Sequence, residues 1–286
     1  MKHYLILICF LFFLLCNGRN VALEIEQKEE MNFADSSLFD EFDWDKSVQL
    51  KQELLANLKK KTLSADVAII RFLTELDEIE EKFNEVLFNR KDYEDLNSLI
   101  FSDKKDIKPI ALQFEQKAKQ HGFNIDSGEG YIYLIKSTTF IKSSIIDILD
   151  PISVKFINLY CEEIDKPCCE DAGIIISKKQ LVDRVFRWGE LLEEVENLKY
   201  EQIVHDEYYL YLSFLYHGTD NTPAFDWNTK KFDKEAFNSM RNIVNTHPNS
   251  KAAIEFVPFL ELLQSANMKE TKEVSDFLKK RFETED

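Results

Sequence analysis

The residues best suited to chemistry are three cysteines close together in the middle of the chain. Cys161 lies near the end of an expected helix, and Cys168 and Cys169 follow in the turn Lys166-Pro167-Cys168-Cys169. A bridge from Cys161 to either of the other two would close a short loop and stabilise the fold by about 2–3 kcal/mol. We therefore interpret the cluster first as a structural disulfide, whose connectivity stays open.

Other chemistry at these cysteines has less support. Metal binding needs three or four converging ligands, and no histidine lies near the cysteines in the sequence. A redox motif of the Cys-x-x-Cys type is absent. A reactive thiol and three unpaired structural thiols remain alternatives, and we expect no metal.

Two loops carry polar side chains that could contact a ligand. Glu129 stands between Gly128 and Gly130, which is typical of a tight turn but also of a backbone that approaches a ligand closely. The longer loop after Gly218 holds four further candidate binding residues, Asp220, Asn221, Asp226 and Trp227. The oxygens of this loop suit calcium, but their spacing matches no EF-hand, so we prefer a capped turn.

Histidines offer little catalytic potential. His205-Asp206 resembles an acid–base pair, yet neighbouring residues on a helix point in different directions. The chain contains no Gly-x-Ser-x-Gly, no His-Glu-x-x-His and no phosphate-binding Walker loop. We therefore expect no catalytic residues and no cofactor.

The N-terminus is typical of an export signal. Lys2 precedes an apolar run of thirteen residues from Tyr4 to Cys16, whereas a membrane span needs about 20. We interpret residues 1–18 as a signal peptide. The run ends on Cys16, as in a bacterial lipoprotein signal whose cysteine is lipidated, but Leu15 departs from the small residue usual there. The chain is therefore expected to be exported, as an envelope lipoprotein or as a secreted protein.

Composition narrows the class of protein. The 286 residues are 44% hydrophobic and 31% charged, which excludes both a disordered chain and a polytopic membrane protein. Acidic residues number 52 against 36 basic ones, so the net charge is -16. Because nucleic-acid binding depends on neutralising phosphates, nucleic acid is excluded as a partner. Contact with a membrane is expected only through a lipid anchor or the signal segment.

The remaining chain is predicted to be helical. Residues 19–45 form an acidic lead-in, whose aromatic end at Phe39, Phe42 and Trp44 is placed to dock onto a single domain of residues 46–286. Apolar residues recur every three or four positions through most of that domain, which predicts an all-α fold, either a multi-helix bundle or an irregular α–α stack. The exception is 123–136, where β-prone residues near 130–136 predict one short extended segment and a subdomain break.

One stretch resembles a known family. Ala236-Phe237 and Met240, followed by His247-Pro248-Asn249 and Ala252-Ala253, resemble the helix–turn–helix junction of tetratricopeptide-type repeats. The match covers only residues 234–266 and occurs once. The resemblance implies an α-solenoid-like packing and a concave surface that binds proteins or peptides.

These observations favour an exported, non-catalytic, acidic helical protein that binds another protein, with a basic protein as the expected partner. The alternative is an envelope hydrolase or thiol-dependent enzyme that uses Glu129, His205, His217 or the cysteine cluster. A structural envelope component is a third interpretation. The sequence does not determine the oligomeric state.

Overall fold

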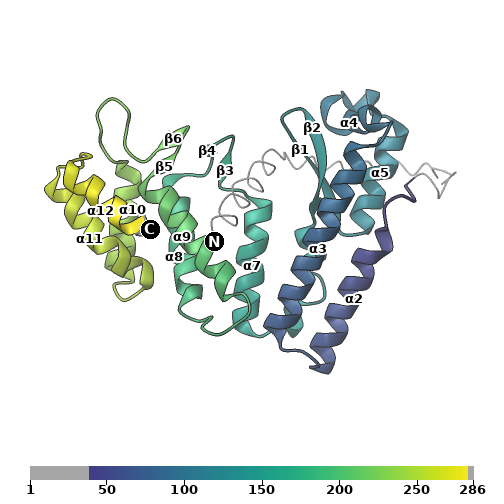
Figure 1. The fold of residues 1–286 in the computed structure, drawn as a ribbon, viewed down its shortest axis with the longest axis horizontal. Coiled ribbons are helices and arrows are strands. Elements are labelled where there is room, and N and C mark those ends of the chain that lie inside the picture. Colours follow the sequence, from purple (N-terminus) through teal and green to yellow (C-terminus); the bar gives the residue numbers. More distant parts are fainter. Residues whose placement is uncertain (1–38, 283–286) are drawn as a thin grey trace. The chain divides into compact units, whose positions relative to one another are not determined.

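The computed structural model describes residues 39–282, which form two compact units (Figure 1). The boundary between the units lies between Leu149 and Asp150, and we call the parts before and after it unit 1 and unit 2. The expected signal peptide and Cys16 lie outside the described residues. From residue 39 to residue 282, no helix is both long and apolar enough to cross a membrane.

Unit 1 consists of helices around one β-hairpin (Figure 1). Its α-helices are α2 (Trp44–Lys60), α3 (Ala65–Phe88), α4 (Tyr93–Phe101), α5 (Pro109–Gln120) and α6 (Thr138–Lys142), with 3-10 turns at Lys104–Asp106 and Ile146–Ile148. Strands β1 (Phe123–Gly128) and β2 (Tyr131–Lys136) pair antiparallel, with Phe123 opposite Lys136 and Gly128 opposite Tyr131. The hairpin packs on α3 and α5, so it belongs to the core of unit 1.

An aromatic cluster forms part of the core of unit 1. The rings of Phe42 and Trp44 stack with centroids 4.7 Å apart, and both contact Phe83 on α3 and Phe114 on α5. Phe39, Phe42 and Trp44 are all buried, so these three aromatic residues pack into unit 1. Burial of such large rings contributes strongly to stability because each removes much apolar area from water.

Gly122 allows the chain to turn from α5 into the hairpin. Its φ of +89° lies in the region that L-residues rarely adopt. A Cβ at this position would lie 2.5 Å from the ring of Phe140. Glycine is therefore required here both by the backbone conformation and by the close approach of α6.

Unit 2 contains six α-helices and two short hairpins (Figure 1). The helices are α7 (Pro151–Asp165), α8 (Lys178–Leu192), α9 (Glu201–Tyr216), α10 (Lys234–Thr246), α11 (Lys251–Ser265) and α12 (Lys272–Phe282). One hairpin pairs β3 (Cys169–Glu170) with β4 (Gly173–Ile174), and the other pairs β5 (Gly218–Thr219) with β6 (Thr222–Pro223).

The helix boundaries of unit 2 follow from capping residues. Asp150 accepts hydrogen bonds from the backbone N–H groups of Ile152 and Ser153 at the start of α7. Ser177 and Gln180 form a capping box at the start of α8. These caps satisfy N–H groups that have no partner inside the helix, and they fix where each helix begins.

The core of unit 2 is centred on α8, which packs against α9, α10 and α11. The buried aromatic side chains include Trp188 from α8, Tyr208, Tyr211 and Tyr216 from α9, and Phe256 and Phe259 from α11. Core packing therefore accounts for most of the aromatic residues of α9.

The structure confirms the all-α class and shows where strands interrupt it. The expected extended segment near 130–136 is β2. Residues 123–136, where a subdomain break was expected, form a hairpin packed inside unit 1. The boundary between the two units lies instead between Leu149 and Asp150. The helical pattern stops at 123–136 because these residues form a hairpin, and four consecutive residues of β2 are buried.

Candidate functional site

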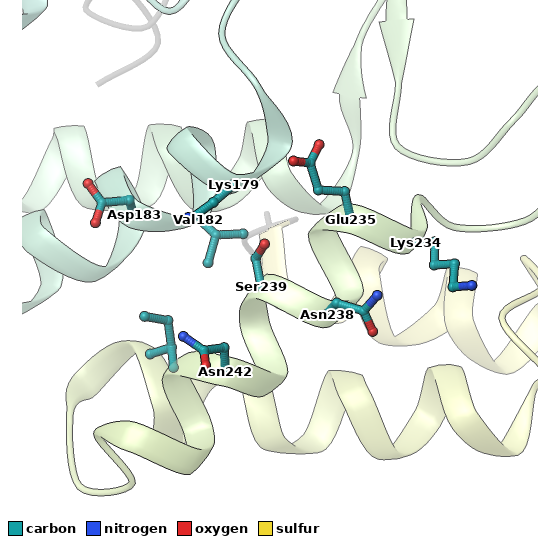
Figure 2. Close-up of a pocket in the computed structure, with 9 residues that line it drawn as sticks. Lys179, Val182, Asp183, Lys234, Glu235, Asn238, Ser239 and Asn242 are labelled. Atoms are coloured by element: carbon teal, nitrogen blue, oxygen red, sulfur yellow. The ribbon is translucent and has the colours of Figure 1, made fainter.

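A groove lies between α8 and α10 in unit 2 (Figure 2). Its volume is about 680 Å³. The lining side chains are Lys179, Val182 and Asp183 from α8, and Lys234, Glu235, Asn238, Ser239, Asn242 and Ile243 from α10. The groove thus combines an apolar part, a set of neutral hydrogen-bonding groups and charges of both signs.

Local sequence explains why these side chains face the groove. On α10, Ala236, Phe237 and Met240 are buried against the rest of unit 2, which leaves Asn238 and Asn242, one helical turn apart, on an exposed side. Asp233 caps α10 by accepting a hydrogen bond from the N–H of Ala236 at 2.8 Å. The side chains of the groove are therefore held on two rigid, capped helices.

A second candidate site is a buried polar network between α7, α8 and α9. Arg184 of α8 is only 3% exposed. Its guanidinium donates to Tyr211 Oη at 2.6 Å, to the carboxylate of Glu163 and to the backbone carbonyl of Lys166. Trp188 Nε1 also donates to Glu163, at 3.0 Å. Because both charges are buried, this ion pair depends on its hydrogen bonds to offset desolvation.

Glu207 on α9 adds a carboxyl group near this network. Burial, together with the nearby charge of Glu163, raises its pKa from 4.5 to about 8. Its Oε2 atom is buried and has no hydrogen-bond partner among residues 39–282. At neutral pH the carboxyl group of Glu207 therefore keeps its proton, since the ionised form would be poorly solvated.

Two of the three cysteines, Cys168 and Cys169, lie close enough to Arg184 and Glu163 for these charges to act on their thiols. Cys161 on α7 and Cys168 are buried, and Cys169 is half-buried at the start of β3. The Sγ atoms of Cys168 and Cys169 are 2.9 Å apart, a hydrogen-bonding distance for sulfur and longer than the roughly 2.05 Å of a disulfide. The expected bridge from Cys161 to Cys168 or Cys169 stays a prediction.

Glu129 occupies a tight turn in unit 1. It is exposed between β1 and β2 with a φ of +51°, and Gly130 follows with a φ of +86°. This geometry is that of a two-residue hairpin loop, in which positive φ values are usual. The turn accounts for the Gly-Glu-Gly pattern, and a binding role for Glu129 stays a prediction.

Asp220 and Asn221 form the turn of the β5–β6 hairpin, which docks on the β3–β4 hairpin. The side chain of Asn221 donates to the carbonyl of Asp171 at 2.5 Å, and its backbone N–H donates to the carbonyl of Ala172 at 3.0 Å. Asp220 is exposed. Asn221 thus has a structural role in joining the two hairpins.

Asp226 caps the next turn, and Trp227 is displayed on it. Asp226 Oδ1 accepts hydrogen bonds from the backbone N–H groups of Asn228 and Thr229 at 3.1 and 2.7 Å. Trp227 is 64% exposed, with Lys230 Nζ 5.9 Å from its ring centroid. No group of three or more His, Cys, Asp or Glu side chains able to hold a metal ion occurs in the described part of the chain.

His205 in α9 and His217 directly after it do not meet. His205 is exposed beside Asp206, with Nδ1 3.2 Å from Oδ1. His217 ends the helix, where its ring contacts Phe282 and burial lowers its pKa. The two histidines are twelve positions apart along the helix, which corresponds to about 18 Å. The structure therefore does not bring His205 and His217 into one pocket.

Comparisons with protein-family models, curated proteins and solved structures find no match to this chain. The tetratricopeptide-type resemblance of residues 234–266 therefore stays a prediction. Its segment forms two consecutive helices, α10 and α11, that pack on each other, and Ala252 and Ala253 are buried. The helix α11 runs through Pro258 without ending there.

Proposed function

We propose that this chain is an exported, non-catalytic protein that binds a segment of another protein in the groove between α8 and α10. The observation that supports this proposal is the composition of the groove, whose lining combines carboxamides, a hydroxyl, charges and apolar side chains within about 680 Å³. Such a mixture suits a peptide, which presents amide groups at regular intervals as well as side chains.

The neutral groups of the groove match a peptide backbone. Asn238 and Asn242 each offer an N–H donor and a carbonyl acceptor, the same pair of functions that a peptide group carries. Ser239 lies between them and adds a hydroxyl group. Val182 and Ile243 supply apolar surface against which a side chain of the partner can pack.

The charged side chains of the groove can fix the direction in which a partner segment binds. Lys179 and Lys234 belong to the first turns of α8 and α10, and Glu235 lies next to Lys234. Asp183 lies one turn further along α8 (Figure 2). A partner segment that carries a positive and a negative side chain can pair with both signs, and the net charge of -16 attracts a basic protein over longer distances.

A thiol-dependent enzyme is the second candidate function, and the Sγ contact between Cys168 and Cys169 favours it. The hydrolase form of the alternative has weaker support because His205 and His217 lie at opposite ends of α9. Export through the N-terminal signal, with or without lipid on Cys16, is part of the proposal.

Site-specific photo-cross-linking tests the protein-binding function. A photoreactive amino acid replaces Asn238 or Asn242 in cells that export the protein, and Asn158 on the exposed side of α7 serves as the control position. We expect both groove positions to cross-link to the same partner protein, which mass spectrometry identifies. The control position should not cross-link to that protein. Equal labelling at all three positions, or no labelling in the groove, would refute the proposal.

A further inference from the structure

Cys168 and Cys169 adopt an arrangement that adjacent residues do not have in a regular strand. Successive side chains of an extended chain point to opposite faces. Here the Sγ atoms of the two neighbours lie 2.9 Å apart on the same side. The chain bends at Cys168 just before β3 begins, which allows the two Sγ atoms to approach each other.

The surrounding contacts hold this bend in place. Arg184 donates to the carbonyl of Lys166, two residues before Cys168. The carbonyl of Cys168 accepts a hydrogen bond from the N–H of Ile175 at 2.9 Å, and Cys169 lies opposite Ile174 in the β3–β4 ladder. The thiol pair is therefore fixed by an ion-pair network on one side and by a hairpin on the other.

We propose that Cys168 and Cys169 form a dithiol that exchanges stoichiometrically with disulfides of small molecules or proteins and closes to a vicinal disulfide, in addition to the binding function proposed above. The two cysteines have different roles. Cys169 is half-buried and so can be reached, whereas Cys168 is 1% exposed. Cys169 is therefore the attacking thiol, and Cys168 completes the exchange.

Electrostatics supports this assignment. The hydrogen bond shared with Cys168 lowers the pKa of the Cys169 thiol despite the opposing effect of burial. The positive charges of Arg184 and Lys178 also lower it, while the charge of Glu163 raises it. The same hydrogen bond and burial raise the pKa of Cys168. A thiolate rather than a thiol is the nucleophile in disulfide exchange, so the lower pKa belongs to the more accessible cysteine.

The exchange balances in two steps. The Cys169 thiolate attacks one sulfur of the incoming disulfide, which forms a mixed disulfide and releases the other half as a thiolate. Cys168 gives its proton to that thiolate and attacks Cys169 Sγ, which forms the Cys168–Cys169 bond and releases the second half of the substrate, which takes up a proton from solvent. The two cysteines are oxidised by two electrons, and one disulfide is reduced to two thiols.

Peptide mapping of the exported protein tests this proposal with oxidised glutathione as the probe. The protein is reduced, freed of reductant, oxidised, quenched in acid, and alkylated under denaturing conditions. A protease that cleaves after glutamate then cuts at Glu163 and Glu170, which separates Cys161 from the peptide 164–170 that holds Cys168 and Cys169. Cleavage after lysine alone would leave all three cysteines together, since Lys166 precedes proline.

The expected product is peptide 164–170 without alkyl groups, lighter than its reduced form by two hydrogen atoms, and a separate alkylated peptide that holds Cys161. Peptides joined through Cys161 would overturn the proposal, because they would show the bridge expected from the sequence. Full alkylation of Cys168 and Cys169 after oxidation would overturn it as well.

Two variants strengthen the test. Cys161→Ser should keep the release of reduced glutathione, and Cys169→Ser should abolish it. Loss of glutathione release in Cys161→Ser, with far-ultraviolet circular dichroism unchanged, would overturn the proposal. If Cys169→Ser does not fold, the proposal is still tested by the peptide mapping of the wild-type chain and by the glutathione release of Cys161→Ser.

Discussion

Arg184 of α8 and Glu163 of α7 form an ion pair whose side chains are 3% and 19% exposed. Tyr211 and Trp188 complete the hydrogen bonds of this pair, so three helices of unit 2 meet at one charged contact. Such a contact contributes specificity to packing because its partners must adopt one arrangement. Burying one of the two charges without the other carries a large free-energy cost.

Replacing Arg184 with alanine is predicted to destabilise unit 2 by about 3–5 kcal/mol, because Glu163 is left buried without its partner. Chemical denaturation followed by tryptophan fluorescence measures this change, since Trp188 and Trp227 both lie in unit 2. Lys155→Ala is the control, because the Lys155–Glu194 pair is exposed and is worth about 0–1 kcal/mol. Equal effects of the two substitutions would contradict the account of the network.

Glu207→Gln is predicted to remove a pH dependence of stability. The folded pKa of Glu207 is about 8 and its ordinary value 4.5, so the folded chain binds more protons than the unfolded chain between these values. The contribution of Glu207 to stability is therefore full below about pH 4.5 and is lost as the pH rises towards 8, by about 1.4 kcal/mol per pH unit at most.

The measurement compares the free energy of unfolding of wild type and Glu207→Gln at pH 5 and pH 8. Because glutamine is neutral at both pH values, the free energy of unfolding of the variant should increase relative to that of the wild type as the pH rises. Glu190→Gln makes the same substitution at an exposed position and is the matched control. If the difference in unfolding free energy between wild type and Glu207→Gln is the same at both pH values, the carboxyl group of Glu207 is not held neutral in the folded chain.

Gly122→Ala is predicted to destabilise unit 1 more than Gly130→Ala. Both glycines have positive φ values, +89° and +86°, so each substitution carries a backbone cost of about 1–2 kcal/mol. Only at Gly122 does the new Cβ meet another group, the ring of Phe140, which adds about 1–3 kcal/mol of overpacking. Thermal unfolding of the two variants checks the order, and a larger effect at Gly130 would contradict the packing described for α6.

Trp227→Ala is predicted to leave the free energy of unfolding within about 0.5 kcal/mol of wild type, as is usual for an exposed side chain. The indole is 64% exposed, so little apolar burial is lost. Trp188→Ala is the contrast, since that indole is fully buried and its loss should cost about 3–5 kcal/mol. A large loss in Trp227→Ala would mean that its loop is packed rather than displayed.

The helices could be predicted because their signals are local. Asp150-Pro151 and the Ser177–Gln180 box mark helix starts that the structure reproduces within a residue. The short hairpins β3–β4 and β5–β6 were not predicted, because two-residue strands leave no periodicity in the sequence. They depend on contacts between distant segments, such as Asn221 with Asp171.

The buried network leaves one signal in the sequence, a charged residue on an apolar helix face. Arg184 lies on the apolar stripe of α8 formed by Leu181, Val185 and Trp188, and a charge on a buried stripe requires a partner. Glu207 stands in the same position relative to Val204, Tyr208 and Tyr211 on α9. The identity of the partners, and the groove between α8 and α10, could not be predicted because they depend on how the helices pack.

The most direct test of the groove is the affinity of the cross-linked partner, once purified, for wild type, Asn242→Trp and Asn158→Trp in isothermal titration calorimetry. Asn242 lines the groove and Asn158 does not, and both are exposed asparagines on helices of unit 2. If the groove binds the partner, Asn242→Trp weakens binding at least about tenfold, or about 1.4 kcal/mol, and Asn158→Trp leaves it unchanged. Equal affinity of wild type and Asn242→Trp would contradict the proposed function.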